Sequence, residues 1–187
     1  MDIRDAFGGG IVIGGLRNML EIKILICYIL SCVGMPITRE QVCESLQQTG
    51  LVNYFDANTA IDELLDNESV TQELTDSEKY LVISSKGKNS AHELESTLLP
   101  GVRDRAVQAA ISITKRARYE KENKVHIQKV DNGYDVTFEI ENKGVRFFTL
   151  TLNLPDSMQA NQLREGFLNN PGELYSNVIE TLLNNLK

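Results

Sequence analysis

The apolar and polar residues in the first third of the chain follow the spacing of helices. Over residues 16–33, apolar positions recur every three or four residues with little polar surface between them, which predicts a helix buried on most sides. Gly34 and Pro36 end this helix, because glycine adopts the left-handed conformation of a helix end and proline cannot continue a helix.

Two shorter helices are predicted next. Thr38 and Gln41 have the spacing of a capping box at the start of the second helix, and Gly50 ends it. Asp56 is the expected cap of a third helix. The apolar residues that we expect on its inward face are Ala57, Ala60, Ile61, Leu64 and Leu65.

The period then changes from helical to alternating. Residues 70–74 and 80–83 predict two strands that form a hairpin through the linker 75–79. A fourth helix is expected to be capped by Ser90 and to end at Leu99. Three helices followed by a hairpin predict a winged helix, in which the second and third helices form a helix-turn-helix pair.

The second half of the chain has a different organisation. A long helix is predicted over residues 102–123. Its apolar side is expected to contain Val102, Ala106, Ala109, Ile113 and Ala117. Three strands follow, over 124–130, 134–141 and 145–154. Asn and Gly in both linkers are typical of hairpin turns, so the strands are predicted to form an antiparallel meander.

Two helices are predicted at the end of the sequence. Asp156 is the expected cap of the first, and Asn170 caps the second, with Pro171 at its first helical position. The predicted fold class is therefore α+β: an N-terminal winged helix-turn-helix domain and a C-terminal domain in which helices pack against a three-stranded antiparallel meander.

We expect three segments along the chain. Residues 1–15 form a Gly-rich arm, residues 16–99 the winged-helix domain, and residues 100–187 an α+β domain for dimerisation or sensing of an effector. The glycines of the arm do not have the spacing of a phosphate-binding loop.

The third helix of a winged helix normally enters the major groove of DNA, where its outer face contacts the bases. Here that face carries Asn58 and Thr59, but also Asp62, Glu63 and Asp66. Phosphate contacts require cations, so this acidic face is the strongest argument against ordinary DNA binding. We therefore expect DNA contacts from Asn58 and Thr59 together with bases on other segments. Those bases are Arg39, Lys79, Lys86 and Lys88.

The predicted helix over 102–123 carries a second group of bases. They outnumber the acids on the same segment, which permits either a phosphate-contacting surface or an ordinary solvated helix face. The solvated face is the favoured interpretation, because charge runs are common on exposed helices.

The composition limits the classes of function. The chain has 187 residues and a net charge of −7, so binding to nucleic acid requires a locally basic surface or a dimer. His92 and His126 have no other ligand-type residues at metal-site spacing, and no hydrolase, metalloprotease or nucleotide-binding motif occurs. No catalytic residue, metal site or cofactor is predicted, and an enzyme is not expected.

The location of the protein is predicted from its cysteines and its apolar segments. Three cysteines and the lack of a secretory leader favour a reducing cytoplasm. The most apolar stretch, residues 22–33, is too short to span a bilayer, so no membrane partner is expected.

The last helix has a wide apolar stripe. It includes Leu174, Val178, Leu182 and Leu186, and it is wider than one small sheet needs. Either both C-terminal helices cover the sheet, or part of the stripe pairs with a second subunit. The second interpretation is favoured and predicts a homodimer.

Several segments together resemble an uncharacterised bacterial family that is catalogued as a domain of unknown function. The resembling segments are residues 23–30, 36–38, 50–55, 61–64, 80–87, 134–136 and 174–175. The N-terminal half of that family is similar to regulators of the PadR class, so the resemblance implies a winged-helix regulator. It supplies no ligand, operator or catalytic residue.

The main functional hypothesis is a cytoplasmic transcriptional regulator that binds duplex DNA as a homodimer. The alternative is a winged-helix module that has lost DNA binding and docks its acidic third helix on a protein partner. A small-molecule effector bound between the helix at Val102 and the sheet is compatible with either hypothesis.

Overall fold

The computed structural model describes residues 16, 18–75, 77–142 and 144–185, so the predicted Gly-rich arm over 1–15 lies outside the described residues. The chain forms two compact units that divide within helix α6 (Pro100–Glu122), between Thr114 and Lys115. The predicted division between residues 99 and 100 lies at the beginning of the same helix. Each unit has a hydrophobic core of its own.

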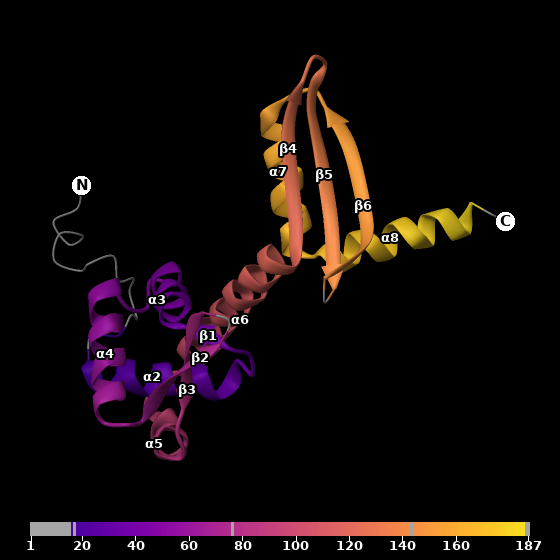
Figure 1. Ribbon diagram of the computed structural model, residues 1–187. Coiled ribbons are helices and arrows are strands. Elements are labelled where there is room, and N and C mark those ends of the chain that lie inside the picture. Colours follow the sequence, from indigo (N-terminus) through magenta and orange to yellow (C-terminus); the bar gives the residue numbers. More distant parts are fainter. Residues whose placement is uncertain (1–15, 17, 76, 143, 186–187) are drawn as a thin grey trace, which may run out of the picture. The chain divides into compact units, whose positions relative to one another are not determined.

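Unit 1, which ends at Thr114, contains a helical core and a small sheet (Figure 1). Its elements are α2 (Met19–Cys32), β1 (Ile37–Thr38), α3 (Arg39–Gln48), α4 (Tyr54–Asp66), β2 (Val70–Thr75), β3 (Glu78–Ile83), α5 (Ser85–Leu94), the 3₁₀ turn η1 (Glu95–Thr97) and the first part of α6. The sheet is antiparallel with the strand order β1-β3-β2.

Helix α2 lies in the centre of the unit 1 core. Ile22, Leu25, Ile26 and Ile29 have no exposed surface, which confirms the prediction of a helix buried on most sides. Gly34 follows the helix end with a φ of +64°, a conformation that glycine adopts without steric cost.

The capping box of α3 is confirmed. The backbone N–H of Gln41 donates to the Thr38 hydroxyl at 3.3 Å, and the backbone N–H of Thr38 donates to the Gln41 side chain at 2.9 Å. Thr38 also pairs with Tyr80 in the sheet, through the two-residue strand β1. Strand β1 was not predicted, because two residues are too few to show an alternating pattern.

The predicted cap of α4 is wrong. Asn53, and not Asp56, is the N-cap, and its side-chain oxygen accepts the backbone N–H of Asp56 at 2.9 Å. The Asp56 carboxylate in turn accepts the side-chain N–H of Asn53 at 2.7 Å. Tyr54 and Phe55 are therefore already helical. The predicted inward face is confirmed for its four buried residues, Ala57, Ala60, Ile61 and Leu64, and Leu65 is half-buried.

The hairpin and the helix after it begin at other residues than predicted. Strands β2 and β3 pair as far as Thr75 and Glu78, so Lys79 belongs to β3 and not to the linker. Ser84 caps α5, where Ser90 was predicted, and its side chain accepts the backbone N–H of Gly87 at 3.2 Å. A Cβ atom at Gly87 would lie 2.3 Å from the carbonyl oxygen of Ser69, so only glycine permits this approach of α5 to β2.

Helix α6 has a different buried side from the one predicted. Val102 and Ala106 are buried as expected, but Ala110 and Thr114 complete the row, and Ala109 is only half-buried. The helical period alone does not decide which of the adjacent residues Ala109 and Ala110 is buried. The Thr114 hydroxyl is satisfied by the carbonyl of Ala110 at 2.7 Å, which allows a polar residue to lie in the core.

Unit 2 is a meander sheet packed on one face by helix α7 (Figure 1). Its elements are the end of α6, β4 (Asn123–Val130), β5 (Gly133–Asn142), β6 (Val145–Leu154), α7 (Ser157–Asn169) and α8 (Pro171–Asn184). The strand order β4-β5-β6 and both predicted helix caps, Asp156 and Asn170, are confirmed. With the helical unit 1 and this sheet, the α+β class is confirmed.

The core of unit 2 lies between the middle strand and α7. Val136, Phe138 and Ile140 alternate onto the buried face of β5. The rings of Phe138 and Phe167 are 4.9 Å apart between their centroids, so α7 is anchored at the centre of the sheet.

A β-bulge attaches α8 to the edge of the sheet. Ile140 pairs with Phe148, but Glu141 pairs with Arg146, so Phe147 is an extra residue in β6. The rings of Phe147 and Phe148 both form T-shaped contacts with the ring of Tyr175 in α8, at centroid distances of 5.5 and 5.6 Å. The bulge thereby brings two consecutive aromatic rings onto one residue of α8.

Candidate functional site

The first half of α4 forms a polar cluster with the start of α3. Arg39 donates to the Asp62 carboxylate at 2.6 Å and to the Asn58 side-chain oxygen at 3.4 Å. Asn58 also donates its side-chain N–H to the carbonyl of Tyr54 at 2.9 Å. The structure thus brings two of the predicted DNA-contacting residues together, Arg39 and Asn58, and Thr59 is exposed beside them.

The acids on the outer face of α4 are less isolated than the sequence indicates. Lys23 of α2 forms an ion pair with Glu63 at 2.8 Å, while Arg39 of α3 pairs with Asp62. Opposite charges at these distances cancel much of each other's field, although exposed pairs contribute little stability. Two of the three acids predicted on this face therefore have basic partners from other helices.

The remaining predicted DNA-contacting residues lie on the hairpin and on α5. Lys86 donates to the carbonyl of Asn67 at 2.6 Å, at the C-terminal end of α4 and about 13 Å along the helix axis from Asn58. Lys79 is exposed on β3 opposite Leu74, and Lys88 is exposed on α5. Lys86 therefore lies at the opposite end of α4 from Asn58, whereas Lys79 adjoins Tyr80, the sheet partner of Thr38 at the start of α3.

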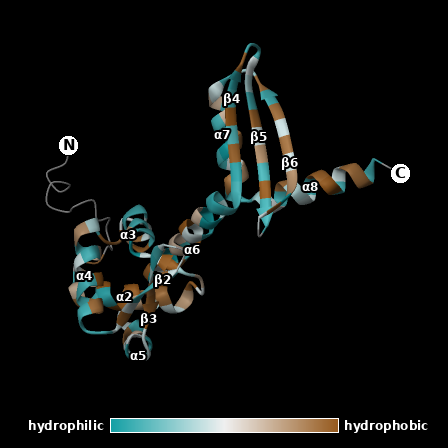
Figure 2. Ribbon diagram, viewed as in Figure 1, coloured by the Kyte–Doolittle hydropathy of each residue, from teal (hydrophilic) through white to brown (hydrophobic). Residues whose placement is uncertain are grey.

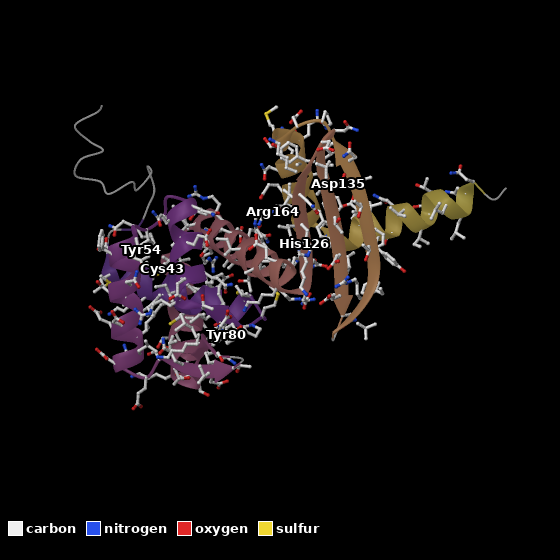
Figure 3. All side chains as sticks on the ribbon, turned by 45° about the horizontal axis from the view of Figure 1, so that its top comes forward. Cys43, Tyr54, Tyr80, His126, Asp135 and Arg164 are labelled. Carbon is white, nitrogen blue, oxygen red and sulfur yellow. The ribbon has the colours of Figure 1, made fainter. Side chains whose placement is uncertain are left out.

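Two exposed aromatic residues at the start of α4 were missed as site candidates. Phe55 is 79% exposed and Tyr54 is 49% exposed, and their rings contact edge to face at a centroid distance of 6.0 Å (Figure 3 labels Tyr54). Leu74 at the end of β2 is 71% exposed. With Asn53 as the cap, the sequence would have placed both rings in the first turn, outside the buried face of the helix.

Four bases of α6 and the strand after it have acidic partners. Arg118 pairs with Glu122 at 3.0 Å, and Lys124 pairs with Glu141 at 3.3 Å. Arg116 is bonded to both Glu120 and Glu165. In unit 1, Arg103 pairs with Glu95 at 3.5 Å and stacks over the ring of Tyr28. These pairs favour the solvated helix face over a phosphate-contacting surface.

The residues with reactive side chains are dispersed. Burial raises the pKa of Cys27 and of Cys43 to about 11, so both thiols stay protonated at neutral pH. On the sheet of unit 2, buried Glu139 pairs with Arg146 at 2.9 Å and lies 3.8 Å from His126 (Figure 3 labels His126). Among the described residues, no group of three or more His, Cys, Asp or Glu side chains is arranged to hold a metal ion.

The predicted dimerisation residues lie along α8. Leu174 packs against the core of unit 2, Val178 is half-buried and Leu182 is 60% exposed, while Leu186 lies outside the described residues. Over the described part of the chain, no helix is long and apolar enough to cross a membrane.

Comparison with known proteins gives one match. The chain matches the model of a domain of unknown function, DUF4364, over residues 22–182, a range that includes nearly all of α2 and of α8 and everything between them. No curated protein and no solved structure matches the chain. The matched range covers most of both units, and the chain therefore belongs to the DUF4364 family.

Proposed function

We propose that unit 1 is a winged helix of the kind found in PadR-type transcriptional regulators, and that the protein binds duplex DNA as a homodimer. The observation that carries this proposal is the order of elements in unit 1. A helix and a short strand precede the helix pair α3 and α4, and the hairpin of β2 and β3 closes a sheet with that short strand. This is the order in which winged helices present their recognition helix.

The surface of α4 supports the proposal in part. Thr59 is exposed in the second turn of α4, in the N-terminal half of the helix, and the positive end of the helix dipole at that terminus favours an approaching phosphate. The pairing of Asp62 with Arg39 and of Glu63 with Lys23 reduces the repulsion that these carboxylates exert on a phosphate backbone. Lys79 extends the basic part of the surface along the hairpin.

A titration of the full-length protein with a fluorescent random duplex, at 50 and 300 mM salt, tests the proposal. We expect binding that weakens steeply with salt, because released counterions drive it. Arg39→Ala should weaken binding further than the loss of one cation alone, since it leaves Asp62 unpaired. Arg118→Ala, which removes a paired arginine on α6, is the matched control. The absence of salt-sensitive binding would contradict the proposal.

The second candidate function is docking of α4 on a protein partner. It is favoured by the exposed side chains of Phe55, Tyr54 and Leu74, because aromatic residues are enriched at the centres of protein interfaces. Major-groove recognition has no evident use for a phenylalanine that is 79% exposed beside acidic residues. The partner would present an apolar pocket with a basic rim.

Affinity capture with and without nuclease separates the two functions. A partner that survives nuclease treatment and is lost with Phe55→Ala supports protein docking. Partners that disappear with nuclease support DNA binding, and Phe55→Ala should then leave the salt-sensitive titration nearly unchanged. Leu20→Ala, at a 54% exposed position on α2, is the matched control for removing an exposed apolar side chain.

The homodimer of this proposal places two copies of α4 on one duplex, and we assign the subunit contact to unit 2. The apolar residues on α8 support this assignment, as the next subsection describes. A cytoplasmic location stays a prediction.

A further inference from the structure

The second half of α8 exposes apolar side chains that the described residues of unit 2 leave uncovered. Pro171 is buried, and Leu174 and Tyr175 pack against the core, but Ile179, Leu182 and Leu183 are 41%, 60% and 59% exposed. Figures 1 and 2 show this part of α8 leaving the sheet with apolar residues along it. A short helix in water is marginal without a packed face, so a covered face is expected here.

An open apolar groove lies beside the start of the same helix. Its volume is about 270 Å³. Its apolar lining comes from β5, β6, α7 and α8, as Phe138, Leu150, Leu152, Leu163, Phe167 and Leu174. Leu152 and Leu163 are 38% and 39% exposed within it, so the groove is unfilled by the unit's own side chains.

The helix cannot fill the groove of its own unit. Leu174 lines the groove, and a straight helix carries Leu182 about 12 Å further along its axis. The second half of α8, which we call the apolar projection, therefore lies next to the apolar groove, and the two meet at Leu174. A two-fold axis beside Leu174 would place the projection of each copy in the groove of the other, which is the self-complementary arrangement of a closed dimer.

The match between the helix and the groove is apolar. Helix α8 carries Glu173 and Glu180 and no Lys or Arg over its described length. On α7, which borders the groove, Arg164 pairs with Glu165 at 3.4 Å, and Glu165 is also bonded to Arg116 (Figure 3 labels Arg164). Among the described residues, Glu173 is the charged residue that lines the groove, so the inserted half of α8 meets mainly leucine and phenylalanine side chains there.

Two of the three polar side chains that line the groove, Asn170 and Glu173 but not Asn177, are engaged with each other and are not available to a small molecule. Asn170 and Glu173 are bonded to each other as the cap of α8, with the Asn170 side-chain N–H 2.9 Å from the Glu173 carboxylate. Ligand sites require polar groups that are available to orient the ligand. These two groups are used within the helix end.

We propose that two copies of this chain exchange their C-terminal helices, so that the second half of α8 from each copy docks in the groove between α7 and β6 of the other. This inference rests on the homodimer of the proposed function but not on DNA binding. It makes Ile179, Leu182 and Leu183 the inserted residues, and Leu152 and Leu163 the residues that receive them.

Two variants of the full-length chain test the exchange. The helix variant is Ile179→Asp with Leu182→Asp, and the groove variant is Leu163→Asp. Sedimentation velocity should show a dimer for the wild type and a monomer for each variant alone, with dimerisation weakened about 30-fold or more. An equimolar mixture should recover a heterodimer, because the intact helix of the groove variant fits the intact groove of the helix variant.

The oligomeric states of the wild type and of each variant alone distinguish helix exchange from other arrangements. If α8 packed against α8 of the partner, the groove variant alone would still dimerise as the wild type does, and this result would overturn the proposal. A groove occupied by a small molecule would leave both variants dimeric, and a monomeric wild type would also overturn it. A dimer that fails the DNA titration leaves the exchange intact, so the two failures are distinguishable.

Two controls separate a loss of the dimer contact from a general effect of an added charge and from a loss of folding. Met158→Asp, at a 68% exposed position on α7 that does not line the groove, should leave the dimer unchanged. Circular dichroism should show the same helix content in all variants. If Leu163→Asp unfolds unit 2, Leu152→Ser replaces it as a milder change in the same groove. Leu152→Ser should weaken dimerisation by a smaller but measurable amount. If the groove is not the contact, Leu152→Ser should leave dimerisation unchanged.

Discussion

The two units of this chain differ in how completely they bury their apolar residues. Among the described residues, the core of unit 1 contains 25 buried apolar residues, whereas that of unit 2 contains six. Unit 1 surrounds α2 with helices and a sheet, while unit 2 covers one sheet face with α7 and the start of α8. Unit 1 therefore has a large core of its own, whereas the small core of unit 2 leaves the second half of α8 exposed, which is the surface where we propose that a second copy docks.

Removing a side chain from the centre of unit 1 tests the first half of this comparison and should have the largest effect. Ile26→Ala replaces a side chain with no exposed surface and should lower the free energy of unfolding of unit 1 by about 3 kcal/mol. Hydrogen exchange of α2 measures this loss, and it should not change with protein concentration. A loss that depends on concentration would mean that unit 1 also needs a partner.

A substitution at the exposed end of unit 2 tests the second half. Leu182→Ala should weaken dimerisation about ten-fold, or about 1.4 kcal/mol, because it shortens one inserted side chain without adding a charge. Exchange protection of α2 should stay as in the wild type. Leu99→Ala, at a 70% exposed position in unit 1, provides the control, and an equal effect of both variants would remove the distinction between the units.

The corrected cap of α4 gives a smaller effect, confined to unit 1. Asn53→Ala should lower the free energy of unfolding of unit 1 by about 1 kcal/mol, because the backbone N–H of Asp56 loses its acceptor. Urea denaturation followed by hydrogen exchange of α4 measures it. Ser90→Ala, at the position once expected to cap a helix, should change stability less. The reverse order would restore the original cap assignment for α5.

The smallest expected effect is a change in the pH dependence of unit 2. The hydrogen bond from Arg116 lowers the pKa of Glu165 below its ordinary value. The carboxylate therefore stabilises the folded state above its unfolded pKa, and this contribution is lost as the pH falls through the folded value. Arg116→Gln should flatten the acid side of the stability profile of unit 2, as monitored by circular dichroism. Unit 1 should show no change.

Local signals predicted most of the fold. The capping box of Thr38 and Gln41, the caps Asp156 and Asn170, and the meander strands each depend on residues close in sequence. The errors occurred where several residues compete locally. Asn53 and Asp56 both favour a cap, and Ser84 and Ser90 do as well, so the choice between them depended on packing that the pattern does not contain.

The candidate site was less predictable than the fold. The position of Asn58 and Thr59 on the outer side of α4 followed from the helical period. The neutralisation of Asp62 and Glu63 did not, because their partners are 23 and 40 residues away in sequence. Counting charges along a helix gives only the charges of that helix, whereas its surface also includes side chains that packing brings from other helices.

The sequence alone determined the α+β class, the antiparallel meander and most helix ends, because period, turn residues and caps act over a few residues. Only the tertiary structure decided that Arg39 contacts α4, that the bulge at Phe147 fastens α8 to the sheet edge, and that the rest of α8 stays uncovered. These depend on contacts between distant segments. An apolar stripe shows that a helix needs a packed face, and only packing shows whether its own chain supplies it.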